Sequence, residues 1–170
     1  MAAPILIFVV GNESRGDDAL APLLLRRLEA WLQKEGRGAD FELIEDFQLQ
    51  IEHAMDLAGR QMVLFIDAGM DTPAPYAFYR AQPRGASTPF SHALTPEAVL
   101  AVYPQIYREA PPPAFILCIR GEQFELGTAL SPAAASRLDS AMGFMQQLLQ
   151  ETEVAAWEMQ AQQPVTQIIH

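Results

Sequence analysis

Three polar clusters in this sequence of 170 residues carry the side chains best suited to chemistry. The loop from Gly11 to Asp18 ends in the acidic pair Asp17 and Asp18, Asp67 directly follows an apolar run, and His92 precedes a helix signal. Each cluster alone has a structural explanation, because acidic residues at a helix start stabilise the helix and an aspartate after a strand often closes a turn. Their combination in one chain points to a shared site.

The position of Asp67 is the strongest reason to expect such a site. It follows residues 62–66, which are apolar throughout, so we expect it to be half-buried, where an unpaired carboxylate is costly. A cation shared by two carboxylates and one imidazole would offset that cost. Oxygen and imidazole ligands without thiolate suit a borderline divalent metal held with open coordination positions.

Other chemistries are less well supported. The first loop could bind a phosphate, but it lacks both the glycine triplet of the dinucleotide fingerprint and the Gly-Lys-Ser/Thr of a P-loop. The sequence contains no Gly-x-Ser-x-Gly elbow, so it gives no support to a serine hydrolase. Cys118 stands inside an apolar run, where a small packing residue is the expected role rather than a nucleophile.

A further polar group follows the second expected strand. Gln48, Glu52 and His53 are close enough in the chain to face one crevice, which suggests contacts with a substrate. The alternative is a solvated face of the short helix expected at residues 51–57.

The elements that must position these residues are predicted by apolar runs and helix signals. We expect strands at residues 5–10, 41–44, 62–66, 76–81 and 114–119, the fourth of them at an edge of the sheet. An amphipathic helix should open near Ala19 and end before Gly36, and a second should run from Thr95 to Tyr107. A last long helix should begin at Ser131 and Pro132, with the serine hydroxyl as its cap.

Strands that alternate with helices predict an α/β fold, a three-layer sandwich with a mostly parallel sheet and helices on both faces. Ligands of such sheets gather at the carboxyl ends of the strands, where the three clusters are expected. We expect a single domain over residues 1–152 and a loosely ordered tail over residues 153–170.

Composition narrows the class of partner. Eleven basic against 21 acidic residues give a net charge of −10, which repels nucleic acid. No apolar run approaches the roughly 20 residues that cross a bilayer, so we expect no membrane partner. A single cysteine cannot form an internal disulfide, which favours a cytoplasmic location.

The sequence resembles the nickel-iron hydrogenase maturation proteases, the endopeptidases that remove a C-terminal extension from the hydrogenase large subunit. The resemblance runs from about residue 5 to 149. Its anchors are Gly11-Asn12 leading to Asp17-Asp18, Asp67-Ala68, Ser91-His92, Arg120-Gly121-Glu122 and Leu130-Ser131-Pro132. Residues 14–20, 47–53 and 124–127 are similar to the subgroup that serves cytoplasmic, NAD-reducing bidirectional hydrogenases.

The resemblance implies a five-stranded twisted sheet and a crevice whose nickel ligands are Asp18, Asp67 and His92. In the family, cleavage awaits nickel insertion, so the nickel would be supplied by the precursor and no organic cofactor is expected. A nickel-polarised carbonyl or water could drive hydrolysis, or Asp17 or Asp18 could act as general base; Asp67 is a further catalytic candidate. We expect a monomer that binds the large-subunit precursor.

Two other functions stay open at the level of sequence. A nickel-dependent docking chaperone would bind the same precursor without cutting it. A stand-alone metallohydrolase would hold its metal tightly and act on small substrates, but the weak set of three ligands argues against it.

Overall fold

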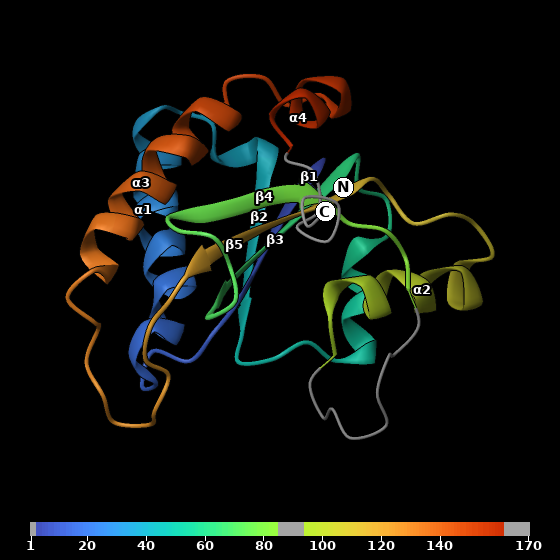
Figure 1. Ribbon diagram of the computed structural model, residues 1–170. Coiled ribbons are helices and arrows are strands. Elements are labelled where there is room, and N and C mark those ends of the chain that lie inside the picture. Colours follow the sequence, from blue (N-terminus) through green and yellow to red (C-terminus); the bar gives the residue numbers. More distant parts are fainter. Residues whose placement is uncertain (1–2, 85–93, 162–170) are drawn as a thin grey trace, which may run out of the picture.

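A five-stranded, mostly parallel sheet forms the centre of the computed structural model (Figure 1), which describes residues 3–84 and 94–161. The strand order is β2-β1-β3-β5-β4, and only β4 runs antiparallel to its neighbour. The strands are β1 (Ile5–Val10), β2 (Phe41–Asp46), β3 (Met62–Gly69), β4 (Tyr76–Arg80) and β5 (Ala114–Arg120). The expected α/β class and the expected edge strand are confirmed.

Helices cover both faces of the sheet, which confirms the three-layer sandwich. In Figure 1, helices α1 (Leu20–Lys34) and α3 (Ala134–Leu148) lie on one face, while the 3-10 helix η3 (Ile51–Leu57) and helix α2 (Pro96–Tyr107) lie on the other. Successive strand residues point to opposite faces, so Ile7 packs in the α1/α3 core and Phe8 in the η3/α2 core. Both cores consist of apolar side chains, as the continuous apolar runs predict.

Local signals explain where the helices begin. The Thr95 side chain accepts a hydrogen bond from Ala98 N at 3.1 Å, and Pro96 occupies the first helical position of α2. Two short 3-10 helices, η1 (Gly16–Ala19) and η2 (Gly38–Asp40), flank α1. The short helix expected at residues 51–57 is present as the 3-10 helix η3.

The segment expected to be a loose tail contains a helix, α4 (Val154–Gln160). Its Trp157 is completely buried, packs edge-on against Phe115 at a centroid distance of 5.3 Å, and donates its indole N–H to Glu151 O at 2.9 Å. A single large aromatic ring buries enough apolar surface to dock a two-turn helix whose hydrophobic pattern is weak. Residues 162–170 lie outside the described residues.

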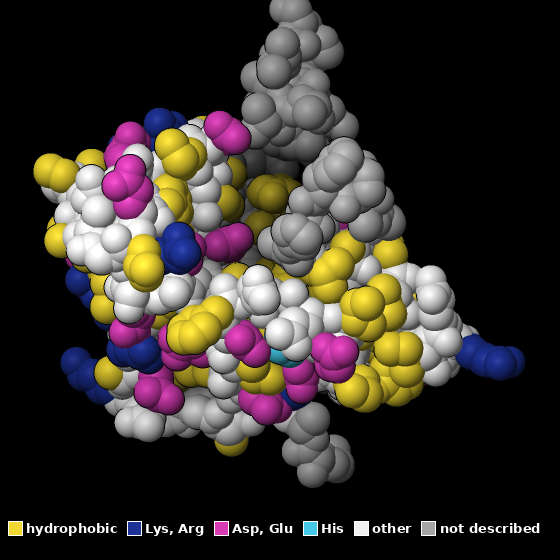
Figure 2. Space-filling model, turned by 90° about the horizontal axis from the view of Figure 1, so that it is seen from below, with side chains coloured by type: hydrophobic (Ala, Val, Ile, Leu, Met, Phe, Trp, Pro, Cys, Tyr) yellow, Lys and Arg dark blue, Asp and Glu magenta, His cyan; other side chains and the backbone are white. Residues whose placement is uncertain are grey.

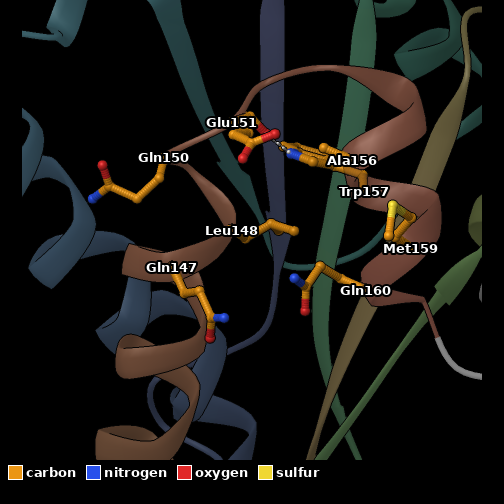
Figure 3. A pocket seen from close by; sticks show the side chains of 8 residues that line it. All are labelled: Gln147, Leu148, Gln150, Glu151, Ala156, Trp157, Met159 and Gln160. Carbon is orange, nitrogen blue, oxygen red and sulfur yellow. Dashed lines mark hydrogen bonds between the residues drawn. The ribbon is translucent and has the colours of Figure 1, made fainter.

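A hollow of about 300 Å³ opens where α4 meets the end of α3 (Figure 3). It lies at the end of the sheet opposite the loops that follow β1 and β2 (Figure 1). Its lining consists mainly of amide and apolar side chains, from Gln147, Leu148, Gln150, Glu151, Ala156, Trp157, Met159 and Gln160. Glu151 is the only ionisable side chain among them, so the hollow offers no catalytic set. Across residues 3–84 and 94–161, no helix has the length and hydropathy of a membrane span.

Candidate active site

The loops that follow β1, β2, β3 and β5 come together at the carboxyl edge of the sheet, the face seen in Figure 2. Backbone hydrogen bonds connect them in series: Gly11 N donates to Asp46 O at 3.1 Å, Gly16 N to Thr128 O at 3.1 Å, and Gly121 N to Gly69 O at 3.0 Å. Because each loop is tied to another, the side chains on this edge have a fixed frame.

Asp17 is the most enclosed of the predicted site residues. Its side chain is completely buried, and its carboxylate accepts hydrogen bonds from Ser131 Oγ at 2.6 Å and Ser131 N at 2.7 Å. The backbone N–H groups of Glu122 and Gln123 donate to it at 2.7 and 3.4 Å. Burial alone would raise the pKa of Asp17, but these hydrogen bonds outweigh it and hold the pKa below its ordinary value.

This environment gives Asp17 a structural task. Both oxygens are engaged, so the carboxylate ties η1 to the loop between β5 and α3 rather than facing a water molecule. The same hydrogen bonds explain why the expected helix cap at Ser131 was wrong. Helix α3 begins at Ala134 without a side-chain cap, because the Ser131 hydroxyl that should have capped it donates to Asp17 instead.

Gly16 makes this connection possible. Its φ of +54° lies in the left-handed region, and a Cβ there would stand 2.5 Å from Gln123 O. Gly11 allows a second close approach, since a Cβ on it would lie 2.3 Å from Asp18 O. The glycines of the first loop therefore serve backbone packing, and we see no role for them as a phosphate cradle.

Asp18, by contrast, is only partly buried, and among residues 3–84 and 94–161 only one of its oxygens accepts a hydrogen bond. Its Oδ2 accepts a hydrogen bond from Asn12 N at 2.7 Å. Burial raises the pKa of Asp18, while the Asn12 hydrogen bond and the positive charge of Arg15 oppose that effect. Of the acidic pair, Asp18 is the residue whose carboxylate can meet a ligand.

Asp67 lies near the end of β3, and its pKa is raised well above the ordinary value. Burial raises its pKa to about 6; a hydrogen bond from Ala68 N at 2.7 Å lowers it, and the negative charge of Asp18 raises it further. The two aspartates, 49 positions apart by their numbers, are therefore close enough to repel each other. Two carboxylates that repel in a partly buried place form a natural receptor for a cation.

The neighbours of Asp67 come from β4 and β5. Asp67 lies opposite Cys118 in the β3/β5 pairing and on the η3/α2 face of the sheet, the same side of β3 as Phe65. Burial raises the pKa of Cys118 to about 11 and that of Tyr79 to about 12, and the charge of Asp67 contributes to both shifts. Cys118 is a neutral thiol at physiological pH, 2.8 Å from Thr72 Oγ1, which agrees with a packing role.

His92 lies outside the described residues, so its place relative to the two aspartates stays a prediction. The described chain resumes at Leu94, which forms an isolated antiparallel bridge with Leu49 and packs in the η3/α2 core. Within residues 3–84 and 94–161, no three His, Cys, Asp or Glu side chains are placed to hold a metal ion.

The three residues expected to contact a substrate divide into two kinds. Gln48 and Glu52 are exposed, but His53 is engaged within the protein. Its Nδ1 accepts a hydrogen bond from Gln50 N at 2.8 Å, so its Nε2 carries the proton and points to Asp46 Oδ2 at 3.2 Å. The ring also packs edge-on against Phe8. His53 therefore stabilises the start of η3, and the sequence alone did not reveal this capping role.

No protein-family model matches the chain, and no curated protein matches it. The NiFe hydrogenase maturation protease HycI from Thermococcus kodakarensis KOD1 superposes with a TM-score of 0.65 at 20% identity, covering 88% of this chain and 94% of that chain. The hydrogenase maturating endopeptidase HybD from E. coli gives 0.65 at 21%, covering 89% and 94%.

The chain has the fold of the hydrogenase maturation proteases. A hydrogenase 2 maturation peptidase from a Thaumarchaeota archaeon also superposes, with a TM-score of 0.58 at 17% identity over 85% of this chain and 97% of that one. The superpositions cover 94%, 94% and 97% of the three solved structures, so nearly the whole of that fold is present in this chain.

Proposed function

We propose that this protein is an endopeptidase that removes the C-terminal extension of a nickel-iron hydrogenase large-subunit precursor after nickel insertion. The observation that carries the proposal is the pair Asp18 and Asp67, two mutually repelling carboxylates at the carboxyl edge of a maturation-protease fold. A divalent cation brought by the precursor would relieve that repulsion, whereas a nickel-free precursor would leave it in place.

Asp18, Asp67 and His92 are the three side chains that would complete the coordination of the precursor's nickel. Support for the histidine comes from Leu94, two positions later, which is fixed beside Leu49 on the face of the sheet to which Asp67 belongs. Binding of the precursor should therefore depend on its nickel. Three weak ligands contribute little binding free energy when the precursor's metal site is empty, but more when they complete the coordination of a bound ion.

Two routes to hydrolysis remain once Asp17 is assigned to the frame. The precursor's nickel polarises the scissile carbonyl or a bound water, or Asp18 removes a proton from an attacking water. In both routes Asp67 holds the substrate's metal. Because burial raises its pKa to about 6, a proton competes with the cation for this carboxylate as the pH falls below that value.

The exposed side chains of Gln48 and Glu52 would contact the precursor, while His53 keeps their segment in place. We propose that the precursor belongs to a cytoplasmic, NAD-reducing hydrogenase. The reason is the similarity of residues 14–20, 47–53 and 124–127 to the subgroup that serves such hydrogenases. We propose a monomer, since the protease must embrace a large partner.

A processing assay tests this function. Purified protein is incubated with nickel-loaded and nickel-free precursor, and the mass of the large subunit is measured. We expect only the nickel-loaded chain to shorten, and we expect Asp18→Asn and His92→Ala to abolish shortening with the fold retained. Asp139→Asn, which alters an exposed ion pair with Arg27, is the matched control and should process normally. Unchanged mass with a stable complex would support a docking chaperone instead.

A further inference from the structure

The carboxyl edge carries large apolar side chains that the fold itself does not use. Phe47 follows β2 and is 69% exposed, Met70 follows β3 and is 57% exposed, and Leu126 lies in the loop after β5 and is 66% exposed. Single exposed apolar residues are common, but three on neighbouring loops at one edge are typical of an interaction surface.

Each of these apolar residues has an acidic neighbour in the chain. Met70 is followed by Asp71 and Leu126 is preceded by Glu125, and neither acid forms an ion pair with any residue that the structure describes. Phe47 follows Asp46, whose carboxylate lies 3.2 Å from His53 Nε2 and accepts its hydrogen bond. On the face seen in Figure 2, acidic and apolar side chains are intermixed, with several basic side chains beside them.

We infer that this rim, defined as Phe47, Met70, Leu126, Asp71 and Glu125, binds an extended segment of the partner protein in which apolar and basic side chains alternate. The apolar residues would be buried by the partner's apolar side chains, and the acids would pair with its basic ones. The inference rests on the proposed function for the identity of the partner, the hydrogenase precursor, but the rim's chemistry is independent of nickel.

Charge decides between this occupant and a second copy of the same chain. A self-association through the rim would bring Asp71 and Glu125 of two copies together in molecules that each carry a net charge of −10. Like charges facing each other oppose such contact, whereas a basic segment is attracted over several ångströms before it docks.

The fixed frame of the edge strengthens the inference. Hydrogen bonds between loops hold the segment around Leu126 as well, because Gly127 N donates to Ser14 O at 2.7 Å. Side chains presented on connected loops lose little freedom when a partner binds, so more of the contact energy appears as affinity. The rim would therefore align the precursor's extension beside Asp18 and Asp67.

A binding experiment tests the rim without any cleavage. The probe is a short fluorescent peptide of alternating leucine and lysine, titrated by anisotropy against the full-length protein. Two comparison peptides alternate leucine with glutamate and serine with lysine. We expect only the leucine-lysine peptide to bind well, and we expect its affinity to fall as salt is raised.

Variants locate the binding. The double substitution M70S/L126S and the double substitution D71K/E125K should each weaken leucine-lysine binding by about tenfold or more. The matched controls are M159S, at a methionine 88% exposed on α4, and E29K, at an exposed acid on α1; both should bind like the unmodified protein. Equal loss in rim and control variants, or equal binding of the leucine-glutamate peptide, would overturn the inference.

Failure of the rim and failure of the proposed function give different results. If both proposals hold, the rim variants raise KM for nickel-loaded precursor while kcat is retained. If the unmodified protein shortens no precursor but the peptide still distinguishes rim from control variants, the rim stands and the protease assignment is lost. If precursor is shortened with unchanged KM in the rim variants, the rim assignment is lost.

Discussion

The Ser131 hydroxyl donates a 2.6 Å hydrogen bond to the Asp17 carboxylate across 114 residues of sequence. With the backbone N–H of Ser131 donating to the second oxygen at 2.7 Å, the contact joins the loop after β1 to the approach of α3. It separates the surroundings of two adjacent acids: both oxygens of Asp17 are engaged by the frame, whereas Asp18 accepts a single hydrogen bond from the part of the chain that the structure describes.

Asp17→Asn should lower the free energy of unfolding by about 1–3 kcal/mol, because an amide nitrogen would face backbone N–H donors that now meet a carboxylate oxygen. Urea denaturation measures the change. Asp139→Asn, at an exposed ion pair, is the control and should cost at most about 0.5 kcal/mol. Equal effects at the two positions would contradict the structural role of Asp17.

The lowered pKa of Asp17 predicts that the free energy of unfolding falls in acid. The pKa of Asp17 is lower in the folded protein than its ordinary 3.8, so its contribution is complete above that value and disappears as pH falls through the folded pKa. Unfolding curves below pH 4 should therefore converge for the unmodified protein and Asp17→Asn. A difference that stays constant through this range would argue against a charged Asp17.

Asp67→Asn should have the opposite effect on stability. Because the folded pKa of Asp67 is raised to about 6, its ionised form disfavours the folded state above that pH, and the penalty is relieved as pH falls towards 4. We expect the variant to be more stable by roughly 1–3 kcal/mol at pH 7.5, with the advantage lost near pH 4. Processing should be abolished, as is common where a site residue is kept at a cost in stability.

Gly16→Ala tests the close packing that encloses Asp17. Its φ of +54° and the 2.5 Å approach to Gln123 O both oppose a side chain, so we expect a loss of about 2–4 kcal/mol in urea denaturation. Gly36→Ala is the matched control, since its φ is +68° with nothing within 4 Å. It should lose only the backbone cost of about 1–2 kcal/mol.

Trp157→Ala should show that α4 belongs to the folded core. Removal of a completely buried indole is expected to cost about 3–5 kcal/mol of unfolding free energy, whereas Met159→Ala, two residues on and exposed, should cost close to nothing. Urea denaturation of both variants gives the comparison. A small effect of Trp157→Ala would support the expected loosely ordered tail instead.

Sequence predicted most of the elements, because their signals are local. Five apolar or alternating runs became five strands, and the hydroxyl and proline at Thr95 and Pro96 marked the start of α2. Placing Asp18 and Asp67 at the same edge also followed from sequence, since parallel strands bring their carboxyl ends together. The strand ends extended further than expected, to Gly69 in β3 and Arg120 in β5.

What escaped prediction depends on contacts that form only in the folded chain. Nothing near Asp17 in the chain announces Ser131 as its partner, and a serine before proline is read locally as a helix cap. His53 looked available to a substrate because its hydrogen bonds to Gln50 and Asp46 form only when η3 folds against β2. Trp157 lacked a periodic pattern around it, although its size alone anchors α4.

Three backbone hydrogen bonds, from Gly11 to Asp46, Gly16 to Thr128 and Gly121 to Gly69, connect the loops of the carboxyl edge and restrict their movement relative to one another. On the proposed function, the conformational adjustment at binding would then fall mainly on the precursor, whose extension would lose conformational entropy, while these connected loops would lose little. The time of cleavage would be set by the state of the precursor's metal centre.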